Sequence, residues 1–121
     1  MSAELLIATR LRLAKEALSG ADLLFREGNR NAAYLAEQAV EQVVLALAQS
    51  EGIHYGRGQH HQLDSMVREL PDENALKASL KSLTWLEAYA TAFRYPKTKG
   101  GLTPAPPYDK LEAASRLRRS C

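Results

Sequence analysis

The chain has 121 residues and a formal net charge of +2, and 45% of its residues are hydrophobic and 25% charged. This length and composition are typical of one globular domain whose core needs neither a disulfide nor a metal. The one cysteine, Cys121, excludes an internal disulfide and suits a reducing compartment. We therefore expect a single domain over residues 1–121.

The N-terminal segment resembles neither a signal peptide nor a membrane span. Glu4 stands where a signal peptide would have a basic region. Arg10 and Arg12 interrupt the apolar stretch that begins at Leu5, which is therefore too short to cross a bilayer. We expect a cytoplasmic protein that does not enter the membrane.

Two long helices are predicted in the first half of the chain. Apolar residues recur every three or four positions over residues 7–25, which indicates an amphipathic helix. Gly20 weakens this helix by about 1 kcal/mol relative to alanine, and Gly28 ends it. A second helix is predicted from about Asn31 to Glu51. The two core stripes are Ile7, Leu11, Ala14, Leu18, Ala21 and Phe25, and then Ala32, Leu35, Ala36, Ala39, Val43 and Leu47.

Two further helices are predicted after a glycine-rich connection. A short helix over about residues 61–70 is stopped by Pro71, because proline cannot donate to the helix ladder. Asp72 is a good N-cap for a long fourth helix, which Pro96 terminates. The buried side of this helix is predicted to consist of Leu76, Leu80, Leu83, Leu86, Ala90 and Phe93.

The remaining segments are a loop and a final helix. Residues 97–107 contain two glycines and three prolines and predict a loop, after which a helix begins near Asp109. Long helices joined by short connections pack as antiparallel neighbours. The predicted fold class is therefore all-α, an up-and-down bundle of about five helices.

Positive charge is concentrated near the C-terminus. Residues 94–121 hold seven basic and two acidic side chains, whereas residues 1–93 hold nine basic and twelve acidic ones. Such a region fits a phosphate-bearing or acidic partner. The simpler interpretation is a solvated helix end, since cations are favoured near helix C-termini.

Several kinds of chemistry have no motif in this sequence. It contains neither a Walker-type phosphate loop nor a Cys-x-x-Cys pair. His54, His60 and His61 lack the spacing of four residues that directs two imidazoles from a helix toward one metal. We expect no metal and no cofactor.

Two groups of polar residues are candidates for a binding site. Gln38 and Glu41 lie three residues apart on one helical face, at the border of the core stripe. They form either a polar pocket wall that faces the fourth helix or a structural hydrogen-bonded pair. Arg94, Tyr95 and Lys97 emerge together where the fourth helix ends. The guanidinium suits a phosphate and the phenol ring can stack on a base, although both residues are also ordinary at a helix end.

Three short motifs follow one another along the chain. They are the run Asn-Ala-Ala-Tyr-Leu-Ala-Glu-Gln-Ala-Val-Glu at residues 31–41, His61-Gln62-Leu63, and Arg94-Tyr95-Pro96. In this order they resemble the second-helix signature, the start of the third helix and the arginine–x–proline end of the fourth helix in the HEPN family (higher eukaryotes and prokaryotes nucleotide-binding domain). Order and spacing agree from about residue 5 to residue 118.

The resemblance carries expectations about fold and partners. It implies an up-and-down helical bundle that commonly forms a homodimer. It also implies frequent pairing with a minimal nucleotidyltransferase, in toxin–antitoxin or related two-part systems. A role in binding nucleotides or other phosphate-bearing ligands is implied as well, and some members are metal-independent endoribonucleases.

The catalytic pair of those ribonucleases is missing from this sequence. The pair consists of an arginine and a histidine separated by four to six residues, and no histidine follows Arg94. Arg57 precedes His60 and His61 with only two or three residues between. Because the histidine moves a proton while the arginine holds the phosphate, we expect no enzymatic activity. A second departure is Leu45, near where many members carry a lysine.

The sequence thus predicts a non-catalytic HEPN-type binding or partner subunit. Arg94 would pair with a ligand phosphate or, without ligand, with Glu41. The predicted ligand-binding residues are Arg94, Tyr95, Lys97, His61, Gln38 and Glu41. An alternative is an RNA-binding or RNA-cleaving enzyme of the same fold that uses Arg94, Lys97 and His61. A third hypothesis is a structural protein whose bundle face recruits a nucleotidyltransferase.

Overall fold

The computed structural model describes residues 3–59, 62–90, 99–102, 104, 106 and 112–117. The regular structure in these ranges is helical, which confirms the predicted all-α class. The elements are α1 (Ala3–Arg26), α2 (Asn31–Ser50), η1 (Arg57–Gln59), α3 (Leu63–Arg68), α4 (Lys77–Lys81) and η2 (Thr84–Tyr89). A further helical segment covers residues 112–117. Within the described ranges, neither long helix has an apolar stretch sufficient to cross a bilayer.

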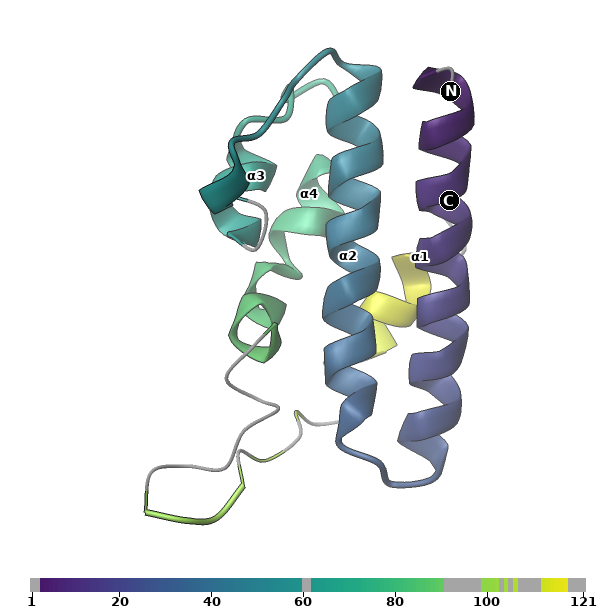
Figure 1. Cartoon of the computed structure of the whole chain (residues 1–121), viewed down its shortest axis with the longest axis vertical. Coiled ribbons are helices and arrows are strands. Elements are labelled where there is room, and N and C mark those ends of the chain that lie inside the picture. Colours follow the sequence, from purple (N-terminus) through teal and green to yellow (C-terminus); the bar gives the residue numbers. More distant parts are fainter. Residues whose placement is uncertain are drawn as a thin grey trace.

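Helices α1 and α2 form the frame of the molecule. They lie side by side and antiparallel, joined by a turn over residues 27–30 (Figure 1). At this turn Gly28 has a φ of 69°, a backbone conformation that side-chain-bearing residues avoid. The N–H groups of Gly28 and Asn29 donate to the carbonyls of Phe25 and Leu24, which ends α1 as predicted.

The predicted apolar stripes of the two long helices face the core. A Cβ added at Gly20 of α1 would lie 3.1 Å from Leu35 Cδ1 of α2, so the Leu35 side chain packs closely over this glycine. Helix α2 is buried around most of its circumference, which makes it the central element of the fold. The buried stripe residues are Ala14, Leu18 and Ala21 on α1, and Ala32, Ala36, Ala39, Val40, Val43 and Val44 on α2.

The shorter elements cover α2 on its other sides. Helices α3 and α4 and the η2 segment lie on the side of α2 away from α1 (Figure 1), and α2 packs directly against α3 and η2. Segment 112–117 (yellow in Figure 1) buries Ala114 and Leu117 in the same core. The Ser115 hydroxyl hydrogen-bonds to the Asp22 carboxylate, which attaches this segment to α1.

The prediction of one continuous helix from Asp72 to Pro96 is wrong over its described part. An α-helix covers only Lys77–Lys81, and a 3-10 helix follows at Thr84–Tyr89. The tighter helix repeats every three residues, so side chains spaced by three lie in one line. Leu80, Leu83 and Leu86 have this spacing and are all buried. Leu80 lies in α4, Leu83 just before η2 and Leu86 within it, so the chain keeps these leucines in the core across the change of helix type.

Asp72 does not cap a helix as predicted. The residue before α4 is Leu76, and Asp72 Oδ1 instead accepts a hydrogen bond from Lys77 Nζ at 2.8 Å. The same ammonium donates to the carbonyls of Arg68, at 3.1 Å, and Leu70. Lys77 is only 8% exposed, so this buried cation satisfies the terminal carbonyls of α3 and fixes α3 to α4.

Replacing this cation tests its structural role. We expect Lys77→Met to lower the free energy of unfolding by about 1.5–3 kcal/mol, because buried carbonyl oxygens lose a charged donor. The measurement is urea denaturation, with Lys81→Met as the control, since Lys81 is exposed on the same helix. Equal losses in the two variants would contradict a specific role for Lys77.

Candidate functional site

Three polar side chains interrupt the buried face of α2. Glu37 is fully buried, Glu41 is 7% exposed, and Gln38 is half-buried. Because Glu37 and Glu41 are four residues apart, their carboxyl groups lie one helical turn apart on the same face. A second carboxyl group, that of Glu37, therefore lies beside the predicted polar residues Gln38 and Glu41.

Sequence reasoning missed Glu37, although a signal for it was present. Ala33, Glu37, Val40 and Val44 follow one another at spacings of four, three and four residues. This spacing places them on one face of a helix, and Glu37 is the one polar residue among the four. A carboxylate in such a row must enter the core, where it is costly unless it is paired. The row containing Ala33, Val40 and Val44 therefore indicated a buried acid.

Hydrogen bonds link the three polar groups. Gln38 Nε2 donates to Glu37 Oε2 at 2.9 Å, and a side-chain hydrogen bond joins Glu37 to Glu41. Burial raises the pKa of Glu41, and the hydrogen bond with Glu37 partly opposes this rise. We refer to Glu37 and Glu41 as the carboxyl pair.

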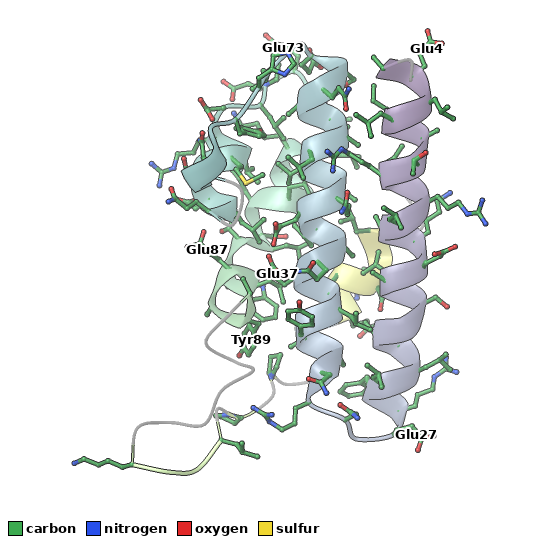
Figure 2. All side chains as sticks on the ribbon, in the orientation of Figure 1. Glu4, Glu27, Glu37, Glu73, Glu87 and Tyr89 are labelled. Carbon is green, nitrogen blue, oxygen red and sulfur yellow. The ribbon has the colours of Figure 1, made fainter. Side chains whose placement is uncertain are left out.

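The carboxyl pair belongs to the part of α2 that packs against the short elements. Figure 2 shows Glu37 on the side of α2 toward η2, where Glu87 and Tyr89 are labelled. The rings of Trp85 and Tyr89 meet edge to face, with their centroids 6.0 Å apart. Glu87 Oε1 accepts the backbone N–H of Asp64 at 3.4 Å, which connects η2 to the start of α3. Glu37 thus faces the segment that was predicted as the fourth helix.

Four of the predicted site residues lie outside the residues that the structure describes. These are Arg94, Tyr95, Lys97 and His61. Their meeting with Gln38 and Glu41, including the pairing of Arg94 with Glu41, stays a prediction. The described residues contain no group of three or more His, Cys, Asp or Glu side chains that could hold a metal ion.

The raised pKa of Glu41 predicts a specific pH dependence of stability. A group whose pKa is higher in the folded state stabilises the fold fully below its ordinary value, here 4.5, and this contribution is lost as pH rises through the folded pKa. Glu41→Gln removes the ionisation. We therefore expect the melting temperature of the variant, relative to the original chain, to increase as pH rises from about 4.5 to 8.

Thermal unfolding across this pH range provides the measurement. Glu73→Gln is the matched control, because it removes an exposed carboxyl far along the chain from α2. Two results would contradict the expected effect of burying Glu41 on stability. One is the same pH trend of the melting temperature in both variants, and the other is a melting-temperature difference for Glu41→Gln that does not change with pH.

Most of the chain matches a single protein-family model. Residues 7–120 match the model described as HEPN domain. The match runs from the first turns of α1 past segment 112–117 and so agrees with the resemblance seen in the sequence motifs. Comparison with curated proteins gave no match, and neither did comparison with solved structures.

Proposed function

Since the chain belongs to the HEPN domain family, we propose that it is a non-catalytic binding and partner subunit whose ligand carries a phosphate group, such as a nucleotide. The observation that carries this proposal is the carboxyl pair, because it lies within the signature run of α2 at residues 31–41. The proposal assigns this pair to the binding site and not to catalysis.

A carboxyl pair repels a phosphate by itself, so the proposed site needs a cation between the two. Arg94 has the required chemistry, because a guanidinium can bind a carboxylate on one edge and a phosphate on another. We assign Arg94 to this bridge from Glu41 to the ligand. Tyr95 would stack on a base, Lys97 would add positive charge, and His61 would orient the cluster or cap α3.

The residues of α2 support binding more than cleavage. A metal-independent ribonuclease needs a group that moves a proton beside a cation that holds the phosphate. Arg94 has no histidine after it, and the carboxyl pair is buried and hydrogen-bonded internally and to Gln38. Such acids are suited to holding a positively charged side chain in place.

The partner expected for this subunit follows from the family. HEPN domains commonly pair with nucleotidyltransferases. We propose a homodimer that associates with a minimal nucleotidyltransferase in a toxin–antitoxin or related two-part system. Co-purification of such an enzyme with the tagged chain supports this assignment, and its failure to associate on co-expression counts against it.

A nucleotide screen with the Arg94→Ala variant tests the binding site. A ligand that binds only the folded state raises its melting temperature. We expect at least one nucleotide to stabilise the original chain and Arg94→Ala to weaken its binding about tenfold or more, since the phosphate loses its charged partner. Arg26→Ala is the control, because Arg26 is exposed at the end of α1. Unchanged binding by Arg94→Ala removes this residue from the site.

The second candidate function is an RNA-binding or RNA-cleaving enzyme that uses Arg94, Lys97 and His61. The excess of basic residues over positions 94–121 favours it. We expect RNA to stay intact when incubated with the purified chain and a metal chelator. Degradation that is abolished by both Arg94→Ala and His61→Ala would overturn the non-catalytic assignment, and gel electrophoresis of the RNA gives the readout.

A further inference from the structure

A surface groove lies apart from the carboxyl pair. It forms where the first half of α1 meets the last turns of α2 and the connection that follows, and its volume is about 200 Å³. Four polar side chains line it, together with four apolar ones: Arg10, Gln49, His54 and Tyr55, and Leu6, Leu45, Ala48 and Ile53. We call it the Arg10 groove. None of the residues assigned to the α2 site lines it.

Arg10 is a half-buried cation that has no acid beside it among the described residues. Its Nη1 donates to the neutral Oε1 of Gln42 at 3.0 Å, and its buried Nε meets no acceptor there. Arg12, two residues further on, instead pairs with Glu16 at 3.4 Å. The bond to Gln42 holds the Arg10 guanidinium in place while other N–H groups of this side chain stay unused.

Two other polar residues of the groove also have unused donors. Neither the Gln49 amide nor the His54 ring makes a side-chain hydrogen bond within the described part of the chain, and His54 is exposed. The neighbouring Tyr55 differs, because its hydroxyl donates to the Met66 carbonyl at 2.7 Å. Three side chains with free donors therefore meet at one groove, and no carboxylate lines it.

We propose that the Arg10 groove binds an oxyanion attached to a small apolar body. Arg10 supplies charge-assisted hydrogen bonds to the oxyanion, and the Gln49 amide and the His54 imidazole add donors at its sides. Leu6, Leu45 and Ile53 remove the apolar body from water. A set of donors with one cation and no acid selects an anion, and the apolar wall selects one that carries a ring or an alkyl group.

A structural role for Arg10 alone explains less of the groove. The hydrogen bond to Gln42 would be enough to connect α1 and α2, and it makes no use of Gln49 or His54. The three residues come from α1, from the last turns of α2 and from the connection after it. A bound ligand would explain why these three polar side chains converge on one partly apolar groove.

The first test compares anions with and without an apolar body. The full chain is titrated with benzoate, phenyl phosphate, acetate and inorganic phosphate, followed by NMR signals of the Gln49 amide and the His54 ring. We expect both signals to shift, and each aryl anion to bind at least about fivefold more tightly than its bare counterpart, because the ring becomes buried. Stronger binding of phenyl phosphate than benzoate would identify a phosphate monoester as the preferred class, and the reverse a carboxylate. Absence of binding, or equal affinities with and without the ring, overturns the proposal.

The second test uses variants with a matched control. Arg10→Gln is expected to weaken binding of the better aryl anion about tenfold, and Arg12→Gln, which removes the same charge from an exposed position, to leave it unchanged. Arg10→Lys and His54→Gln decide the matter if Arg10→Gln does not fold, and each should weaken binding about threefold or more. Equal effects in the Arg10 and Arg12 variants, or no effect in any of them, would assign Arg10 to structure alone.

Discussion

Two carboxyl groups buried one turn apart on the central helix impose the constraint on which the proposed site depends. Glu37 is fully buried and Glu41 is only 7% exposed, so the pair is costly unless it is protonated, accepts hydrogen bonds or gains a cation. Gln38 supplies one donor, and the raised pKa of Glu41 shows that burial favours its protonated form. A nearby guanidinium would relieve the remaining cost, and this links the core of α2 to the proposed ligand.

The fold could be predicted from the sequence where apolar spacing, helix propensity and turn residues all indicate the same element. Apolar stripes, a left-handed glycine at Gly28 and good helix formers define α1 and α2, so both bounds of α2 and the end of α1 could be predicted closely, whereas the start of α1 at Ala3 could not. The fourth helix could not, because Leu80, Leu83 and Leu86 are spaced by three and fit both an α-helix and a 3-10 helix. In the structure η2 packs against α2 and α3, contacts that spacing along the chain does not reveal.

In the candidate sites too, residues on one helix face could be identified from the sequence, whereas residues brought together from different elements could not. Gln38 and Glu41 could be identified because they share one helix face, whereas Glu37 was missed because only one polar row of that helix was considered. Arg10, Gln49 and His54 are separated in sequence and meet only because α1 and α2 are antiparallel. No spacing rule within one helix would group them.

Glu37 and Glu41 are buried, and we propose that Arg94 holds this carboxyl pair in place. A carbon-13 NMR titration of the glutamate side-chain carboxyls, in the original chain and in Arg94→Ala, tests it most directly. We expect the Glu41 carboxyl to titrate above the ordinary value of 4.5, and the loss of Arg94 to raise its pKa further, because a nearby cation favours the ionised form. Titration of both carboxyls at the ordinary value, with no change on loss of Arg94, would contradict it.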